Sequence, residues 1–333
     1  MWKGDGALLT DLYQLNMMAA YLEHGLTETA VFELFVRKLP SHRGFLMAAG
    51  LEQALQFLET LSFTAEELDA IRSLGQFSDS FIAWLGSFRF TGDVDAMPEG
   101  TAFFPDEPIL RVVAPLPEAQ FVETRLVNLL HFQTVIASKA ARMVLAVRGK
   151  PLIDYGLRRA HGAEAGVLAA RASYIAGFSG TATVAAGIAF GIPVYGTMAH
   201  SFVQAHDDEV LAFKHFARSH PQGLVPLIDT YHTERAATRV VALAPRLAAE
   251  GLQSRGCVST ATTSASTRQK FAGSSTRAGC SPSRSSPAVA STRTLCSNYR
   301  GLVRRSMRLD GSCGAKPDRP LLGACVCHGR SRW

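Results

Sequence analysis

The stretch IPVYGTMAHSF at residues 192–202 has the pattern of a buried strand, a polar turn and the start of a helix. We expect a strand over Ile192–Met198 and a helix over Phe202–Arg218. The same order occurs in PLIDYGLRRAHG at residues 151–162, where a strand over Pro151–Tyr155 precedes a turn with two arginines. Repetition of strand, turn and helix predicts parallel strands joined by crossover helices, which is an α/β fold.

The alternation extends on both sides of these two stretches. Towards the C-terminus the pattern predicts a strand over Val225–Tyr231 and a helix over Ala236–Glu250. An Ala-rich helix over Gly162–Gly177 and a short segment at Thr181–Ala189 lie between the two stretches. We therefore expect residues 150–253 to form one region of parallel strands joined by crossover helices.

The first 149 residues have a different organisation. Helices are expected over Leu8–Gly25, Gly44–Leu61 and Pro117–Leu145, and a strand over Ala30–Leu39. Thr64 and Glu67 have the capping-box spacing, which predicts a further helix that ends at Gly75. Short strand-like runs broken by prolines fill Phe88–Leu116. These residues predict an N-terminal α/β domain with a small sheet and one long helix.

Charge and cysteine divide the chain near residue 254. The residues from Arg255 onward hold 14 Lys and Arg but only two acids, whereas the residues before it carry 20 basic and 26 acidic side chains. An acidic body argues against nucleic acid as a partner. All six cysteines lie in the same basic segment, without the paired spacing of zinc ligands. We expect residues 254–333 to form an aberrant, low-complexity tail without a stable fold.

Targeting signals are not visible in the pattern. The N-terminus lacks the features of a signal peptide, and no apolar run of 18 residues is free of charge. A body without cysteine is typical of a reducing compartment. These observations predict a cytoplasmic protein without a membrane partner.

The turns after the two strands hold the candidate chemistry. Ligands of parallel α/β folds bind at the carboxyl ends of the strands. Arg158 in the first turn could bind a carboxylate or phosphate with forked hydrogen bonds, and Thr197 in the second offers a hydroxyl. His200 is expected at a helix start, where a negatively charged adduct is favoured, and could act as a nucleophile or a base.

Each of these residues also has a structural interpretation. Arg158 taken alone is more often the partner of a surface ion pair. A lone histidine such as His200 is more often a structural residue, and Tyr13 on an amphipathic helix is usually part of the core. The Phe32–Val36 run and the Lys139–Arg142 helix face are equally ordinary when each is taken alone. Only their combination and order are specific.

Together, these motifs resemble the nicotinate phosphoribosyltransferase family over Leu8 to about Gly251. The motifs are T-D-L-Y-Q at residues 10–14, F-x-L-F-x-R-x-x-P at 32–40, K-A-A-R at 139–142, D-x-G-x-R-R-A-x-G at 154–162, G-T-x-A-H-S-F at 196–202 and D-T-Y at 229–231. The resemblance implies that residues 150–253 form a partial, incomplete α/β barrel of the type II phosphoribosyltransferase kind, which carries the catalytic site. It also implies an activity, in which nicotinate and phosphoribosyl pyrophosphate form nicotinate mononucleotide with coupled ATP hydrolysis, a step of NAD salvage.

The resemblance assigns roles to individual residues. His200 matches the histidine that ATP phosphorylates, Tyr13 and Thr197 match positions that contact nicotinate, and Arg158 matches the lining of the same site. Mg²⁺ is expected to accompany phosphoribosyl pyrophosphate and ATP, with no metal site or tightly bound cofactor in the protein itself. A homodimer is also expected, because active sites of the family tend to be completed across a dimer.

Two positions depart from the family pattern. Thr181-Ala182-Thr183 stands in place of a G-T-S-N type of turn, and His232 stands where aspartate is more usual. These departures leave the local roles of both positions open.

The tail departs from the family altogether, and the genetic code offers an explanation. The codons possible for Arg255–Gly273, read from each third base, permit G-V-R-L-D-S-x-D-L-G-E. The codons for Ser283–Leu295 likewise permit I-F-A-S-G-G-L-D-E-Y-A, and both are family motifs in the family's order. We therefore expect a change of reading frame near Ser254, which would leave this chain poorly folded and inactive. The alternative is a genuine basic tail.

Two other functions stay open at this point. One is a related enzyme that uses nicotinamide or quinolinate, although the motif at residues 196–202 favours nicotinate. The other is a non-catalytic remnant or regulatory binding module with the same fold.

Overall fold

A computed structural model describes residues 6–39, 41, 43–147, 149–221, 223–252, 256–258 and 321–327, the last segment for its backbone only. The chain divides into two compact units, which we describe separately. The first contains the described residues up to Met143, Gly162–Gly177 and the segment at 321–327. The second contains Val144–His161 and the described residues from Phe178 to 258.

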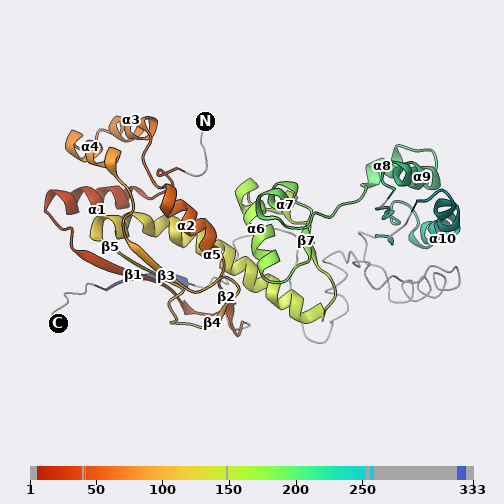
Figure 1. The fold of residues 1–333 in the computed structure, drawn as a ribbon, viewed down its shortest axis with the longest axis horizontal. Coiled ribbons are helices and arrows are strands. Elements are labelled where there is room, and N and C mark those ends of the chain that lie inside the picture. Colours follow the sequence, from red (N-terminus) through yellow and green to blue (C-terminus); the bar gives the residue numbers. More distant parts are fainter. Residues whose placement is uncertain are drawn as a thin grey trace. The chain divides into compact units, whose positions relative to one another are not determined.

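The first unit combines helices with a small antiparallel sheet (Figure 1). Its order is α1 (Leu12–Glu23), β1 (Thr29–Lys38), β2 (Leu46–Met47), α2 (Leu51–Thr60), α3 (Ala65–Ser73), α4 (Asp79–Ser87), β3 (Asp93–Ala96), β4 (Ala102–Phe103), β5 (Leu110–Pro115), α5 (Leu116–Val147, whose last turn belongs to the second unit), α6 (Ala163–Ile175) and β8 (Leu321–Cys327).

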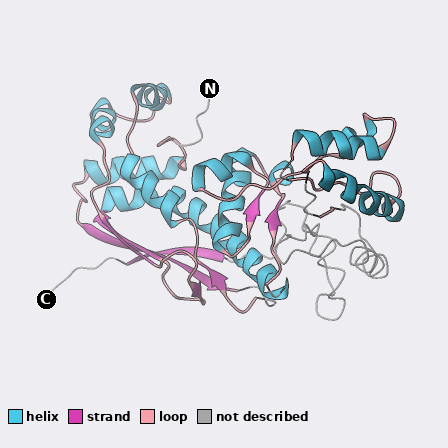
Figure 2. Ribbon diagram, turned by 45° about the vertical axis from the view of Figure 1, so that its right-hand side comes forward, coloured by secondary structure: helices cyan, strands magenta, loops and turns pink. Residues whose placement is uncertain are grey.

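The main sheet has the strand order β3-β5-β1-β8. Alternate residues of β1 are buried, among them Phe32, Leu34 and Val36, as expected for a strand with one covered face. The covered face packs against α5, which contributes Val122 and Leu126 to the same core. Figure 2 shows the helices of this unit gathered on that side of the sheet.

The capping box predicted at Thr64 is confirmed. The Thr64 hydroxyl accepts from the Glu67 N–H, and the Glu67 carboxylate accepts from the Thr64 N–H. Gly75 follows α3 with a φ of 67°, a conformation that suits glycine at a helix end. The next helix, α4, was missed, although Ser78 caps it by accepting from the Phe81 N–H at 3.3 Å.

The second unit begins with short parallel strands. Its elements are β6 (Ile153–Asp154), a 3₁₀ turn (Leu157–Arg159), β7 (Gly180–Thr181), α7 (Val184–Phe190), α8 (His200–Gln204), α9 (Glu209–Ser219) and α10 (Thr233–Ala249). β6 pairs with β7 in parallel, and Thr181 bridges to Val194 in parallel. Figure 2 shows the β6–β7 pair as two short arrows. The mixed α/β class is confirmed.

Several sequence-based boundaries were wrong. The helix expected over Gly44–Leu61 begins only at Leu51, as α2, and Leu46–Met47 before it forms strand β2. The strand expected over 192–198 has one bridged residue, Val194, and the strand expected over 225–231 is bridged at Leu227, which pairs in parallel with Val258. The helix expected over 202–218 is two helices, α8 and α9, separated at Ala205–Asp208. Asp207 and Asp208 favour a turn over a helix interior, which accounts for the break.

The helices α8, α9 and α10 enclose the core of the second unit. Val203, Phe213, Leu224 and Leu243 are among its buried side chains. This cluster fixes the loop that carries Thr197 and His200, because Met198 in the same loop is one of its members.

Most of the tail from residue 254 lies outside the described residues. The exceptions are 256–258 and β8, whose backbone pairs antiparallel with β1 from Val31 to Lys38. No helix in the described part of the chain is long and apolar enough to cross a membrane.

Candidate functional site

The turn after β6 is held by Asp154. Its carboxylate accepts from the Gly156 N–H at 3.0 Å and from the Thr181 hydroxyl at 2.9 Å. Burial raises the pKa of the Asp154 carboxyl, and these two hydrogen bonds act in the opposite direction without cancelling the effect. Asp154 therefore fixes both the start of the arginine-bearing turn and its neighbour β7.

Arg158 lies in the 3₁₀ turn that follows, with its side chain exposed. This placement at a strand end agrees with the sequence-based expectation. The exposed guanidinium is available for an anion, as a site for carboxylate or phosphate requires.

Thr181 belongs to one of the two departures from the family pattern, and it is fully buried. Its hydroxyl donates to Asp154 and accepts from the Thr183 N–H at 3.0 Å. The Thr-Ala-Thr turn is therefore a hydrogen-bonded turn that stabilises the end of β7. The second departure, His232, is the N-cap residue of α10.

Thr197 and His200 lie on the loop between Val194 and α8. The Thr197 hydroxyl donates to the Val225 carbonyl, and His200 Nδ1 lies 3.2 Å from the Thr230 hydroxyl. His200 is the first residue of α8, as expected from the sequence. However, α8 has only five residues, so its dipole provides a weak reason for an anion at this position.

The parallel ladder orders these strand ends along one edge. The Ala182 N–H donates to the Asp154 carbonyl at 2.8 Å, and the Tyr195 N–H donates to the Thr181 carbonyl at 2.9 Å. In this ladder β7 therefore lies between β6, which ends at Asp154, and the segment that leads to Thr197 and His200. The structure brings Arg158, Thr197 and His200 to the carboxyl ends of strands within one unit.

Tyr13 belongs to the first unit, on the exposed side of α1, with 47% of its surface accessible. The structural interpretation of the sequence placed Tyr13 in the core, but the structure leaves its side chain exposed. Its hydroxyl accepts from the Gln14 amide at 2.9 Å. Burial raises the pKa of the Tyr13 phenol, a hydrogen bond with Thr124 lowers it, and the charges of Glu123 and Asp11 raise it further.

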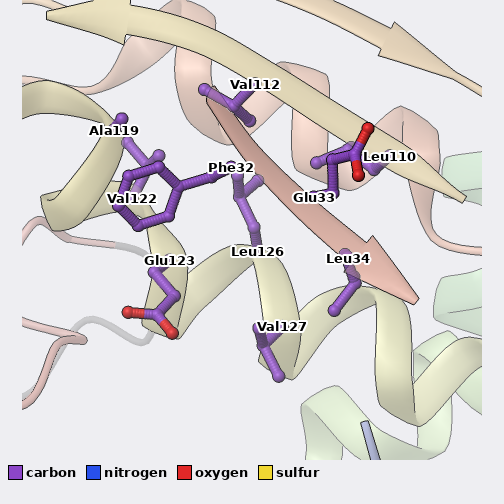
Figure 3. Close-up of a pocket in the computed structure, with 10 residues that line it drawn as sticks. All are labelled: Phe32, Glu33, Leu34, Leu110, Val112, Ala119, Val122, Glu123, Leu126 and Val127. Carbon is purple, nitrogen blue, oxygen red and sulfur yellow. The ribbon is translucent and has the colours of Figure 1, made fainter. Parts of the chain in front are cut away.

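A small apolar pocket between β1, β5 and α5 does not coincide with these residues (Figure 3). Its two acidic lining residues are engaged elsewhere: Glu33 binds Arg111, and Glu123 accepts from Gln14 and Gln120. Figure 3 shows the Glu123 carboxylate directed away from β1. This pocket belongs to the core of the first unit.

No cluster of three or more histidine, cysteine, aspartate or glutamate side chains that could hold a metal ion occurs within the described ranges. A magnesium ion bound mainly through substrate phosphates needs at most one or two protein carboxylates.

Two contributors were missed as site residues, Thr181 and Thr230. Each contacts a strand-end residue about one strand-helix repeat away in sequence, 27 residues for Asp154–Thr181 and 30 for His200–Thr230. A search of the sequence for polar residues one strand–helix repeat after each strand end could have identified them.

Comparison with known proteins finds matches to one family over most of the chain. The profile described as the nicotinate phosphoribosyltransferase (NAPRTase) N-terminal domain matches residues 8–131, and the one described as the nicotinate phosphoribosyltransferase (NAPRTase) family matches residues 151–274. The chain is 53% identical over 242 residues to nicotinate phosphoribosyltransferase pncB2 of Mycobacterium tuberculosis, which covers 73% of this chain and 52% of that protein. It is 46% identical over 231 residues to nicotinate phosphoribosyltransferase of Bacillus subtilis, covering 69% and 47%.

Solved structures agree. Human nicotinic acid phosphoribosyltransferase superposes with a TM-score of 0.73 at 29% identity, over 81% of this chain and 65% of that one. Nicotinate-nucleotide pyrophosphorylase from Pyrococcus furiosus, at 21% identity, shares the fold with a TM-score of 0.64, over 85% and 66%.

The matched profiles and the mixed α/β architecture define a chain of the phosphoribosyltransferase kind. The chain belongs to the nicotinate phosphoribosyltransferase family. It spans about half the length of the curated relatives that it matches.

Proposed function

We propose that this chain carries the nicotinate phosphoribosyltransferase function of its relatives, which joins nicotinate to the ribosyl phosphate of phosphoribosyl pyrophosphate and releases pyrophosphate. The observation that supports this proposal is the placement of Arg158, Thr197 and His200 at the carboxyl ends of parallel strands, each on a turn held by side-chain hydrogen bonds. This edge is where ligands of such folds bind.

The side chains match the chemistry of the substrates. Nicotinate is a flat aromatic anion, so the exposed ring of Tyr13 and the guanidinium of Arg158 suit its two features. Thr197 adds a hydroxyl on the same loop as His200. In ribosyl transfer the anomeric carbon loses pyrophosphate through a state with oxocarbenium character while the pyridine nitrogen forms the new bond.

His200 is the proposed site of coupling to ATP. Its imidazole attacks the terminal phosphorus of ATP, the bond to the ADP oxygen breaks, and a phosphohistidine forms. Hydrolysis of that phosphohistidine accompanies turnover. Mg²⁺ enters with the two phosphate-bearing substrates, and its charge supports departure of pyrophosphate.

Phosphoryl transfer to the protein tests this assignment. Because a frame change near Ser254 would abolish the activity of the present chain, the parent in this test is the protein with its reading frame restored. It is incubated with ATP labelled at the γ-phosphate, and acid-labile label on the protein is measured. We expect label in the parent and loss of at least about tenfold in His200→Asn, whereas His215→Asn, at an exposed position on α9, keeps it. Equal labelling of both variants would rule out His200 as the acceptor.

The proposal includes a homodimer and a cytoplasmic location. The dimer follows from the resemblance, because active sites of the family tend to be completed across a dimer. Sedimentation of the full chain measures the oligomeric state directly, and a monomer at micromolar concentration would contradict the dimer.

A change of reading frame near Ser254 is also part of the proposal. The family motifs R-L-D-S and S-G-G-L-D-E, with the phosphate-binding loop that follows them, are missing from residues 254–333 as translated. The match of the family profile to residue 274 runs past Ser254 and opposes an early frame change. Sequencing of the locus from several independent templates decides the matter, since an intact single frame ends this idea.

The functional consequence of a frame change is loss of turnover. A chain without the later strands leaves sheet edges unpaired and lacks the groups that hold the phosphates. We expect no measurable pyrophosphate release from nicotinate by the 333-residue chain, and normal release after the frame is restored. Normal turnover by the present chain would contradict this expectation and would leave the basic tail as a genuine segment.

A non-catalytic binding module is the second candidate, favoured by the same altered tail. It differs in the labelling experiment, because a module without catalysis gives no phosphohistidine even after the frame is restored. Pyrophosphate release with nicotinate, nicotinamide and quinolinate, compared in the restored protein, separates nicotinate use from that of related enzymes.

A further inference from the structure

The exposed ring of Tyr13 is attached to a buried polar cluster between α1 and α5. Gln14, the next residue, is fully buried, and Gln120 is 4% exposed. Neither side chain is explained by hydrophobic packing, because a buried amide costs free energy unless its hydrogen bonds are made.

The hydrogen bonds fix the orientation of the Gln14 amide. The Gln120 Nε2 donates to the Gln14 Oε1 at 2.6 Å, so the Gln14 oxygen is occupied as an acceptor. The Gln14 Nε2 donates to the Glu123 carboxylate at 3.0 Å, and the Gln120 Nε2 donates to the same carboxylate oxygen at 2.9 Å. A carboxylate cannot donate, which excludes the flipped amide.

The same Nε2 reaches the Tyr13 hydroxyl at 2.9 Å. It also lies 3.1 Å from the Thr124 hydroxyl, which in turn donates to the Asp11 carboxylate at 3.1 Å. The Tyr13 hydroxyl is therefore held at one end while the ring stays 47% exposed. A ring that is anchored by its hydroxyl presents its face with fewer accessible orientations.

We propose that Gln14, oriented by Gln120 and Glu123, is a positioning residue that holds the Tyr13 ring ready to contact the flat aromatic ring of the substrate. This inference rests on the proposed function for the identity of the ligand, but the anchoring of Tyr13 is independent of it. Gln14 does not contact the substrate, since its side chain is buried. Preorganisation of a contact residue increases affinity by reducing the entropy lost on binding.

The hydrogen bond from the Gln14 Nε2 to the Tyr13 hydroxyl is called the anchor here. The first experiment measures this anchor without any ligand. Tyrosine labelled with ¹³C at Cζ is introduced into the full chain, and the Tyr13 resonance is assigned with Tyr13→Phe. Gln14→Leu removes a donor that stabilises the phenolate, so the phenol should titrate about half a pH unit higher or more. The control is Gln133→Leu, the same substitution at an equally buried glutamine of α5 that contacts Arg171 instead.

The result of this experiment is decisive for the anchor. A Tyr13 titration that moves in Gln14→Leu but stays within about 0.1 unit in Gln133→Leu supports the inference. An unchanged Tyr13 resonance in Gln14→Leu, or equal changes in both variants, overturns it.

The second experiment asks whether the anchor acts through the ring on ligand binding. Dissociation constants for nicotinate are measured by calorimetry for the parent, Gln14→Leu, Tyr13→Phe and the double variant. We expect a loss of about tenfold for Gln14→Leu in the parent and less than about twofold in the Tyr13→Phe background. Equal losses in both backgrounds would indicate a general destabilisation and would overturn the positioning role.

The two experiments separate this inference from the proposed function. If neither the parent nor any variant binds nicotinate, before or after the reading frame is restored, while the Tyr13 titration responds to Gln14→Leu, the proposed function fails and the anchor stands. If nicotinate binds but Gln14→Leu leaves its affinity unchanged, the proposed function survives and the positioning role fails.

Discussion

Within each of the two units, side-chain hydrogen bonds join residues at a different separation in the sequence. In the first unit, the side-chain hydrogen bonds of longest reach join residues 72 to 119 positions apart, as in Arg171–Glu99, Gln14–Thr124 and Arg171–Glu52. In the second, the bonds at the candidate site join residues 27 to 30 positions apart, from Asp154 to Thr181, Thr197 to Val225 and His200 to Thr230. Each of the latter links one strand end to the next repeat.

The two units should therefore respond differently to the loss of a single contact. Long-range contacts in the first unit converge on few buried residues, so the loss of one should weaken several elements at once. Contacts in the second unit are sequential, so each strand end depends on the repeat that follows it. A chain that departs from its family after residue 253 would therefore lose support at its last repeat first.

Arg171 offers the strongest test of convergence. Its guanidinium, on α6, binds both oxygens of Glu99 at 2.7 and 2.8 Å and also Glu52, with a side chain only 8% exposed. Arg171→Met should lower the free energy of unfolding by about 3–5 kcal/mol, because it leaves the Glu99 carboxylate without its partner. Urea denaturation followed by circular dichroism gives the value.

An exposed ion pair serves as the control for Arg171. Arg72 pairs with Asp69 three residues away on α3, where both side chains are more than half exposed. Arg72→Met should change the free energy of unfolding by less than about 1 kcal/mol. Similar losses for the two variants would refute convergence on Arg171.

Gly180 tests the close approach of neighbouring strands in the second unit. A Cβ at this position would lie 2.3 Å from the Pro193 carbonyl oxygen and 2.6 Å from the Tyr195 ring. Gly180→Ala should therefore cost about 1–3 kcal/mol of stability through forced separation of β7 from the 193–195 segment.

Gly223, in the same unit, is the matched control for Gly180. A Cβ there would meet no atom of the described residues within 4 Å, and its φ is not in the left-handed region. Gly223→Ala should be neutral or stabilising by up to about 1 kcal/mol, because alanine restricts the unfolded chain. Thermal unfolding of both variants gives the comparison, and a neutral Gly180→Ala would show that these strands are not in close contact.

The acid stability of the first unit depends on Glu99. Burial acts to raise the pKa of its carboxyl, but hydrogen bonds from Arg171 and from the Gly50 and Leu51 N–H groups outweigh it and leave the pKa below the ordinary value of 4.5. A lowered pKa in the folded state stabilises the protein above pH 4.5, and this contribution disappears as the pH falls through the folded-state value.

We expect Glu99→Gln to be less stable than the parent at pH 7 and to lose less stability between pH 5 and pH 3. Unfolding curves at a series of pH values measure the slope. Parallel slopes for the parent and Glu99→Gln would mean that other carboxylates govern the acid transition.

Much of this organisation was predictable from local sequence signals. The capping box at Thr64, the strand at 29–38 and the long helix from 116 follow from short-range rules and are present. The motif order also predicted the family. The strands at 192–198 and 225–231 were predicted too long, because apolar residues there pack against α8–α10 as well as in a sheet, and composition does not separate the two environments.

Polar contacts between distant residues were not predictable in the same way. No local pattern marks Gln14 or Arg171 as buried, since each owes its burial to partners that lie far away in sequence. The exposed position of Tyr13 was likewise hidden, because amphipathic spacing favoured the core.

Asp154 gives the smallest expected effect and distinguishes positioning by charge from positioning by shape. Burial raises the pKa of its carboxyl, so the folded state holds its proton more tightly than the unfolded state does. The contribution of Asp154 to stability therefore falls as the pH rises from its ordinary value of 3.8 through the folded-state value. Asp154→Asn keeps an oxygen for the Gly156 N–H, and its amide can donate to the Thr181 hydroxyl, which then accepts a second hydrogen bond and loses the acceptor of its own proton. Since no buried charge remains, we expect Asp154→Asn to be within about 1 kcal/mol of the parent at pH 7, whereas Asp154→Ala loses about 1–3 kcal/mol through the unsatisfied Gly156 and Thr181 donors. If Asp154→Asn is as unstable as Asp154→Ala, the negative charge itself holds the arginine-bearing turn, and the strand end is organised electrostatically instead of by the shape of its hydrogen bonds.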